Sequence, residues 1–269
     1  MEASRAALAH ARATLPAPPK LPADAYYDVG DMTRALLGDG LDGVCQTRDN
    51  RVLVASEAEF PAGPQRSVEW WFSAGCRGDD EYRLWHPDDH VAGTWTDGWF
   101  SKAPADVVGE THRVTERLGK IGASKYRIQF VPASTYGVGA AEKAAAGCEV
   151  ALTARIATHD AVLGWLDVGH FIHFTLPRDG GGFRLVSRFW LFDVDVSAGS
   201  SLNFAGGLVR ALANTTAVRS VAARAIGGGP PGTLGRALWT HASEEMRVLA
   251  SFLPALYGSK GGEREVAVS

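Results

Sequence analysis

His241 and Glu245 lie four residues apart in the segment 233–257, whose apolar residues recur at helical spacing. At 100° per residue both side chains project from one face of a helix, so their heads can converge on one point. Glu244 falls on the opposite side, which the pattern predicts to face solvent. Zinc accepts imidazole nitrogen and carboxylate oxygen, so the pair fits half of a metal site. An exposed hydrogen-bonded pair is the alternative. The apolar stripe beside them consists of Leu238, Ala242, Met246, Leu249, Leu253 and Leu256.

A second group of ionisable residues lies in the segment 82–91. His86 and His90 flank Pro87, Asp88 and Asp89, so two imidazoles and two carboxylates fall within five residues. Proline pushes the residue before it out of helical space, and an aspartate pair favours a turn. We therefore expect a segment that is partly extended or looped, which either supplies ligands or forms a surface turn with solvated charges.

The segment 110–116 is a third source of ligands. Strand alternation places Glu110, His112, Val114 and Glu116 on one face. If that face is concave, one of its carboxylates could meet the histidines and the glutamate described above.

Another pair of histidines, His170 and His173, lies in an apolar strand-like run. Their odd separation places them on opposite faces, so only one can point into a pocket. A strand histidine is more often structural than catalytic. The aromatic residues suit either a core or the wall of a cavity for an aromatic ligand: Trp70, Trp71, Tyr82, Trp85, Trp95, Trp99, Phe100 and Trp190.

These residues need a scaffold, and the pattern of apolar residues and turns predicts one. Residues 2–15 fit a short helix that ends at a proline-rich stretch, and 67–73 fits a strand or a buried helix equally well. Residues 201–226 are compatible with a helix, and 233–257 is a strong amphipathic helix. Consecutive antiparallel strands followed by a long helix indicate an α+β fold in which the helix closes over the concave face of the sheet. The strands are expected at 51–57, 111–118, 125–131, 149–157, 167–175 and 183–192.

Composition narrows the classes of function. The chain has 269 residues, of which 27 are basic and 30 acidic, giving a formal charge of −3. This balance argues against nucleic-acid or anionic-membrane partners. No stretch reaches the roughly 18 apolar residues of a membrane helix, and the N-terminus does not look like a signal peptide. We expect a cytoplasmic protein. Its three cysteines, Cys45, Cys76 and Cys148, form no CxxC pair, so any zinc must be held by His and Glu.

Four segments together resemble the 2,4-diacetylphloroglucinol hydrolase family, which also includes phloretin hydrolase. They are VEWWF, YRLWHPDDHV, GHFIHFTLPRDGGGFRLVSRFWL and THASEEMRVLASFLPALY, in that order between about residues 67 and 257. The resemblance implies a helix-grip, START-like fold. It divides the chain into an N-terminal extension with a dimerisation role (1–66), a catalytic domain (67–260) and a flexible tail (261–269). It also implies a homodimer.

The resemblance further implies a zinc ion held by two histidines and two glutamates. Carried across by motif, these are His90 at the end of WHPxDH, the pair His241 and Glu245, and a strand glutamate. Glu116 matches the strand glutamate because it precedes a Leu-Gly turn, and Glu110 is the alternative.

The activity that the resemblance implies is hydrolysis of the carbon–carbon bond between an acyl group and a phenolic ring, with an acylated polyphenol as substrate. Tyr82, His86 and His173 are the expected catalytic residues, which donate a proton or hold a ring hydroxyl. The alternative is a non-catalytic or cyclase-like module that binds aromatic polyketides, because a fold does not dictate a function.

Overall fold

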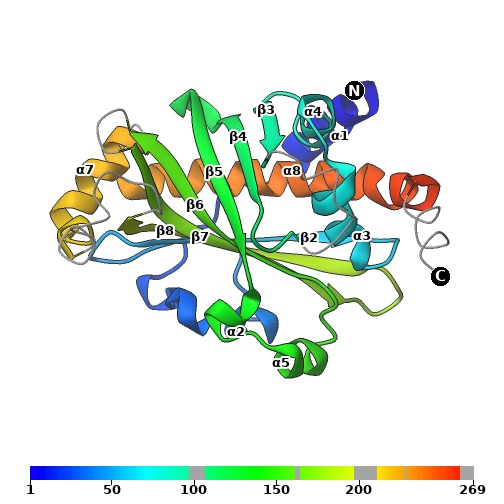
Figure 1. Ribbon diagram of the computed structural model, residues 1–269, viewed down its shortest axis with the longest axis horizontal. Coiled ribbons are helices and arrows are strands. Elements are labelled where there is room, and N and C mark those ends of the chain that lie inside the picture. Colours follow the sequence, from blue (N-terminus) through cyan, green and yellow to red (C-terminus); the bar gives the residue numbers. More distant parts are fainter. Residues whose placement is uncertain (97–106, 161–163, 197–210, 228, 261–269) are drawn as a thin grey trace.

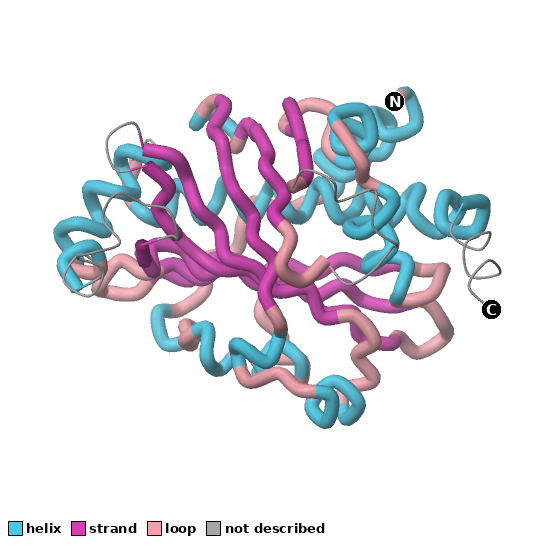
Figure 2. The backbone as a smooth tube through the Cα atoms, viewed as in Figure 1, coloured by secondary structure: helices cyan, strands magenta, loops and turns pink. Residues whose placement is uncertain are grey.

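The computed structural model describes residues 1–96, 107–160, 164–196, 211–227 and 229–260. Its centre is one antiparallel sheet in the order β1-β2-β8-β7-β6-β5-β4-β3 (Figures 1 and 2). Strands β3 to β8 follow one another as neighbours, whereas β2 pairs with β8. The strands are β1 Gly43–Gln46, β2 Val52–Phe60, β3 His90–Trp95, β4 Thr111–Arg117, β5 Ala123–Val131, β6 Ala151–Asp160, β7 Gly164–Pro177 and β8 Phe183–Val196.

A 30-residue helix, α8 (Pro231–Lys260), runs across one face of this sheet (Figure 1). It packs on β1, β2 and β8, and its apolar side joins a core of residues from the sheet and from α3 and α4. Register irregularities in β3, β6 and β7 bend the sheet around the helix, as β-bulges do. The predicted α+β fold, with an antiparallel sheet gripping a long C-terminal helix, is confirmed.

The opposite face of the sheet carries a second core. Met32, Ala35 and Leu36, in and beside α2 (Thr33–Leu36), pack with Ile172 and Phe174 of the sheet. Helix α5 (Ala140–Ala145) lies on the same side (Figure 1). Burial on both faces explains why β7 and β8 read as almost continuous apolar runs instead of alternating ones.

The first 66 residues contribute two strands to the sheet, of which the sequence predicts one, at 51–57. Strands β1 and β2 both precede residue 67, and β2 forms a nine-residue ladder with β8. The sheet therefore begins earlier in the chain than the expected start of the catalytic domain. Helix α1 (Glu2–Thr14), predicted at 2–15, packs against α8.

Three short helical elements lie between β2 and β3 in the chain, and the last of them packs on β3. The ambiguous segment 67–73 is helical, as α3 (Arg66–Trp70) followed by the π-helical turn Trp71–Gly75. Helix α4 (Asp79–Trp85) then ends where Pro87 forces His86 into an extended conformation. The segment 82–91 is thus partly extended or looped, as predicted. Its first four residues end α4, which three acidic residues in the first turn favour, and β3 begins at His90.

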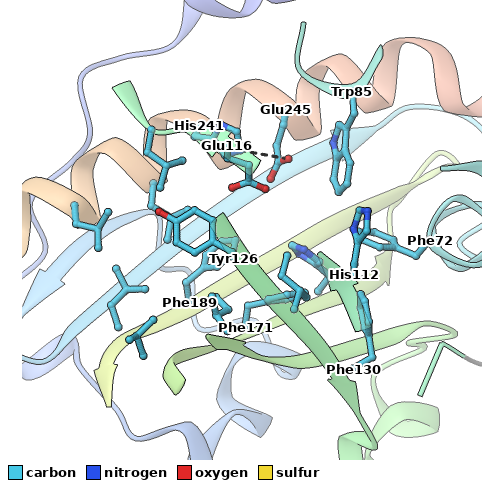
Figure 3. A pocket seen from close by; sticks show the side chains of 18 of the residues that line it. Phe72, Trp85, His112, Glu116, Tyr126, Phe130, Phe171, Phe189, His241 and Glu245 are labelled. Atoms are coloured by element: carbon cyan, nitrogen blue, oxygen red, sulfur yellow. Dashed lines mark ion pairs between the residues drawn. The ribbon is translucent and has the colours of Figure 1, made fainter. Parts of the chain in front are cut away.

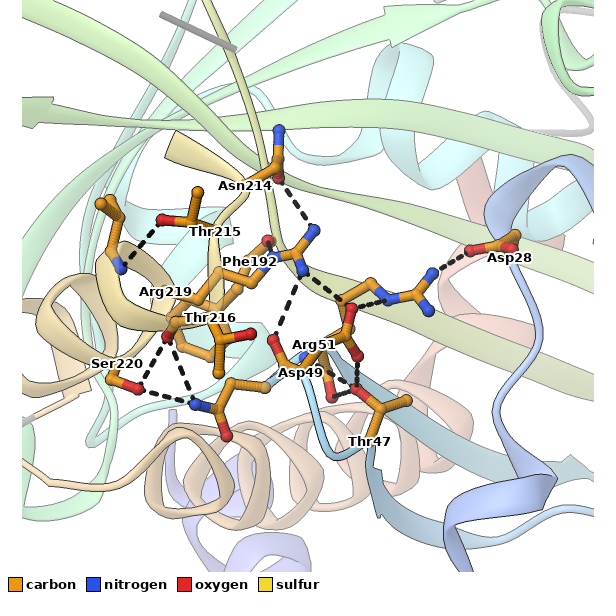
Figure 4. Close-up of polar contacts among 12 residues, drawn as sticks. Asp28, Thr47, Asp49, Arg51, Phe192, Asn214, Thr215, Thr216, Arg219 and Ser220 are labelled. Atoms are coloured by element: carbon orange, nitrogen blue, oxygen red, sulfur yellow. Dashed lines mark hydrogen bonds and ion pairs between the residues drawn. The ribbon is translucent and has the colours of Figure 1, made fainter. Parts of the chain in front are cut away.

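Helix α7 (Thr216–Gly227) is fastened to the sheet by Arg219 (Figure 4). Its Nε donates to the carbonyl of Phe192, at 2.9 Å, and its Nη1 lies 2.9 Å from Asp49 in the β1–β2 turn. Phe192 has a positive φ of 66° and lines the cavity between sheet and α8. Of the predicted helix 201–226, the part from Thr216 is helical, a turn at Asn214 and Thr215 interrupts it, and residues 201–210 lie outside the described residues. No helix in the described part of the chain is long and apolar enough to cross a membrane.

A buried arginine ties the N-terminal segment to the outer face of β8. Arg188 is fully buried and forms ion pairs with Asp39, before β1, and with Glu57 of β2.

We expect Arg188→Ala to lower the free energy of unfolding by about 3–5 kcal/mol, because it leaves a buried carboxylate without its partner. Urea denaturation measures this. Arg184→Ala is the matched control on the same strand, since Arg184 is 37% exposed and pairs with Glu57 at 3.4 Å. It should lower the free energy of unfolding by no more than about 1 kcal/mol. Equal losses of stability in the two variants would contradict the prediction.

Candidate metal centre

A pocket lies between α8 and the concave face of the sheet (Figure 3). Most of its wall is aromatic or aliphatic, and Glu116, His241 and Glu245 form a polar end where α8 passes β4. Its aromatic wall includes Phe72, Tyr82, Trp85, Tyr126, Phe130, Phe171, Phe189 and Phe192, and its polar residues include His112, Glu116, His173, His241 and Glu245.

Three of the predicted ligands converge at this polar end, where His241 and Glu245 line the pocket and His90 lies beside them outside its wall. His90, His241 and Glu245 each offer one ligand atom, and these atoms lie within 4.8 Å of one another. The Glu245 Oε2 atom is 3.3 Å from His90 Nε2 and 3.7 Å from His241 Nε2. All three side chains are buried. The i, i+4 spacing on α8 therefore gives the convergence that the sequence predicts.

The contacts around His90 test whether this group suits a cation. Its Nδ1 lies 2.8 Å from the Tyr82 carbonyl, which can only accept, so Nδ1 carries the proton and Nε2 is an acceptor. Nε2 is buried without a hydrogen-bond partner among the described residues. It faces the Glu245 carboxylate, which is another acceptor. Two buried acceptors that face each other need a proton or a cation between them, and a divalent cation fits this requirement.

The pKa shifts of His90, Glu245 and His241 agree with this requirement. Burial lowers the pKa of His90 to about 3, helped by the neighbouring charge of His241. Burial also raises the pKa of Glu245 well above its usual value. Burial alone would lower the pKa of His241, but Glu245 and Asp89 outweigh it and raise the pKa. In the protein without a cation, the imidazolium of His241 is thus the positive charge that balances these carboxylates.

Glu116 approaches the same point from β4. It is the register partner of His90, and it lines the pocket with His241 and Glu245 (Figure 3). Its carboxylate accepts a hydrogen bond from the Tyr82 hydroxyl. It is not part of the group whose ligand atoms lie within 4.8 Å. Glu110 precedes β4 and is not part of the pocket wall.

Tyr82 joins the two sides of the centre. Its ring stacks on His90 at 3.8 Å with an interplanar angle of 4°. Burial and the neighbouring Glu116 hold the pKa of its hydroxyl well above the usual range. Gly93 makes this packing possible, because a Cβ there would lie 2.8 Å from the Tyr82 ring and 2.9 Å from His112 Nε2. The tyrosine therefore keeps its proton and presents it beside Glu116.

His86 takes a different place from the one expected of a catalytic residue. It is fully buried but is not part of the pocket wall, and it stacks on His241 at 4.8 Å. Its Nε2 lies 3.1 Å from Glu244. The prediction that Glu244 faces solvent is wrong, since Glu244 is only 6% exposed. Helix α1 packs over that side of α8, and a helix pattern cannot reveal such a cover.

Of the two β7 histidines, His173 is the one that faces the pocket. Its Nδ1 is 2.8 Å from Ser187 Oγ, and burial lowers its pKa to about 3, so the ring is neutral. His170 contacts Tyr136 on the other face.

His112 is a pocket residue that sequence reasoning did not select. Its ring stacks on Trp95 at 4.4 Å, and burial lowers its pKa to about 3. The available signal was its place four residues before Glu116 on the same strand face. Of the aromatic residues proposed for the wall, Tyr82 and Trp85 line the pocket, whereas Trp190 belongs to the opposite core. Trp99 and Phe100 lie outside the described residues.

Residues 28–258 match the model of a protein family described as the DAPG hydrolase PhiG domain. No curated protein matches the chain. Three solved structures align at low similarity. Protein Ms6760 from Mycobacterium smegmatis is 14% identical, with a TM-score of 0.33 over 68% of this chain and 97% of its own. Ara h 8.0201 is 11% identical, with a TM-score of 0.31 over 64% of this chain and 97% of its own. The human StarD13 (DLC2) lipid transfer and protein localization domain is 14% identical, with a TM-score of 0.28 over 72% of this chain and 96% of its own.

Proposed function

The chain belongs to the DAPG hydrolase PhiG-domain family, and from this premise we propose that it is a zinc-dependent hydrolase of acylated polyphenols. The bond to be cleaved joins an acyl carbon to a phloroglucinol-type ring, and the products are a carboxylic acid and the deacylated phenol. The observation that carries the proposal is the buried group of His90, His241 and Glu245 at one end of an aromatic-lined pocket.

His90, His241, Glu245 and Glu116 are the residues that would hold the metal. The unpartnered Nε2 of His90 and the nearby carboxylate support this assignment. The chemistry that zinc supplies when bound is Lewis acidity toward a carbonyl oxygen. No cysteine lies in this group, and imidazole with carboxylate is a common zinc ligand set.

The rest of the pocket suits the phenolic part of the substrate. Phe130, Phe171 and Phe189 offer ring faces and edges against which a flat ring can pack. The neutral ring of His173, oriented by Ser187, can hold a ring hydroxyl. An apolar enclosure also keeps bulk water away from the reacting bond.

Cleavage leaves an electron pair on the ring carbon, which must accept a proton. The Tyr82 hydroxyl keeps its proton because of its raised pKa, and it already donates to Glu116 beside the candidate ligands. We assign Tyr82 as the proton donor. His86 is not part of the pocket wall, so we do not assign it a direct role on the substrate.

Incubation of the purified protein with 2,4-diacetylphloroglucinol and with phloretin tests this function. We expect release of acetate from the first, or of the aryl-propionate from the second, in equal amounts with the deacylated phenol. Saturable binding of both compounds without any product would instead favour a non-catalytic binding module.

A further inference from the structure

The described contacts link the N-terminal helix to the candidate metal centre. Resting on the proposed function, we propose that Arg12 of α1 is a positioning residue for that centre. It braces the loop that carries His90 against the helix that carries His241 and Glu245. The brace runs through Asp88 on one side and through Glu244 and His86 on the other.

The innermost contact orients a ligand. His241 Nδ1 lies 3.0 Å from Asp89 Oδ2, so this nitrogen donates to the carboxylate and Nε2 points toward Glu245. A carboxylate in this position fixes the tautomer and the orientation of a metal-binding histidine. Asp89 immediately precedes His90, so the same loop orients one ligand and supplies another.

His86 connects this contact to Glu244. Its Nδ1 accepts a hydrogen bond from the Asp89 backbone N–H at 3.1 Å, so Nε2 carries the proton. Nε2 then donates to Glu244 Oε2 at 3.1 Å. The ring lies against the His241 ring, with centroids 4.8 Å apart. His86 therefore fixes the Asp89 backbone, one face of His241 and the Glu244 carboxylate at once.

Arg12 completes the brace from outside. Its Nε lies 3.2 Å from Glu244 Oε2, and its Nη1 lies 2.5 Å from Asp88 Oδ2. Asp88 belongs to the loop before β3, whereas Glu244 belongs to α8. The planar guanidinium thus bridges the two elements that carry the ligands, which a lysine cannot do with the same geometry. Arg12 lies in residues 1–27, outside the part of the chain that matches the family model.

The alternative use of these residues is a second cation. His86, Asp89 and His241 also have ligand atoms within 4.8 Å of one another. Both nitrogens of His86, however, already have partners, in contrast to Nε2 of His90. Arg12 also supplies the positive charge that Glu244 needs. The geometry thus favours a brace around one metal over a two-metal centre.

Zinc affinity of the metal-free full-length protein tests the brace, measured by competition with a chromophoric chelator. We expect Arg12→Ala to weaken zinc binding about 10-fold, the lower end of the usual effect of residues that orient metal ligands. Arg12→Lys should fall between the wild type and Arg12→Ala. The matched control is Arg5→Ala on the same helix, because exposed Arg5 contacts only Asp88 in this network, at 3.3 Å; it should change the affinity less than 2-fold.

A double variant separates the brace from general packing. If Arg12 acts through Glu244, adding Arg12→Ala to Glu244→Gln should cost less affinity than Arg12→Ala costs alone. Metal-free melting temperatures of Arg12→Ala and Arg5→Ala should agree. Unchanged affinity in Arg12→Ala, equal losses in both arginine variants, or two zinc ions per chain would overturn the brace. A wild type that binds no zinc would overturn the proposed function instead.

Discussion

Glu245→Gln is expected to abolish zinc uptake and to lower kcat/KM about 10³-fold or more, which corresponds to about 4 kcal/mol of lost transition-state stabilisation. The amide keeps the shape of the side chain but removes the charge that faces His90 Nε2 at 3.3 Å and His241 Nε2 at 3.7 Å. Because Glu245 is buried on α8 without a large cavity to open, the fold should persist. Metal analysis, circular dichroism and steady-state kinetics on the same preparation measure the three effects.

Glu59→Gln provides the matched control, since Glu59 is an exposed glutamate of β2 that pairs with Arg178. It should retain zinc and activity. Retention of zinc and full activity by Glu245→Gln would remove Glu245 from the centre.

Glu116→Gln is expected to lower both zinc affinity and kcat/KM about 10²-fold, equal to about 2.7 kcal/mol. The substitution removes a carboxylate that faces the pocket opposite His90 and weakens the acceptor of the Tyr82 hydrogen bond. Competition with a chelator and steady-state kinetics measure the two losses separately.

Glu110→Gln decides between the two strand glutamates that the sequence left open. Glu110 is buried but is not part of the pocket wall, so this variant should keep the zinc affinity of the wild type. A larger loss of zinc in Glu110→Gln than in Glu116→Gln would reverse the assignment.

Local periodicity explains what the sequence could predict. The helix 233–257 and the five strands from β4 to β8 are recognisable because each buries a face with its own repeat. The convergence of His241 and Glu245 follows from helix geometry alone. Alternation placed Glu110 and Glu116 on one face of the segment 110–116, and the resemblance to the hydrolase family then selected Glu116 for its place before a Leu-Gly turn.

Other features depend on contacts between distant segments, which periodicity does not encode. Glu244 looks exposed on its own helix and is covered only because α1 returns to pack there. His86 and His90 are four residues apart in one motif, yet only His90 joins the group with His241 and Glu245, whereas His86 stacks on the His241 ring. His112 enters the pocket through the register of β4, so its role could not be separated from core packing by sequence alone.

The most direct measurement is a zinc titration of the chelator-stripped protein, with release of acetate from 2,4-diacetylphloroglucinol as the readout. The buried acceptor pair of His90 and Glu245 predicts that activity is absent without metal. It should then rise linearly with added zinc and level off at about one zinc per chain. Full turnover by the metal-free protein would contradict the assignment of this pocket as a metal-dependent hydrolase site.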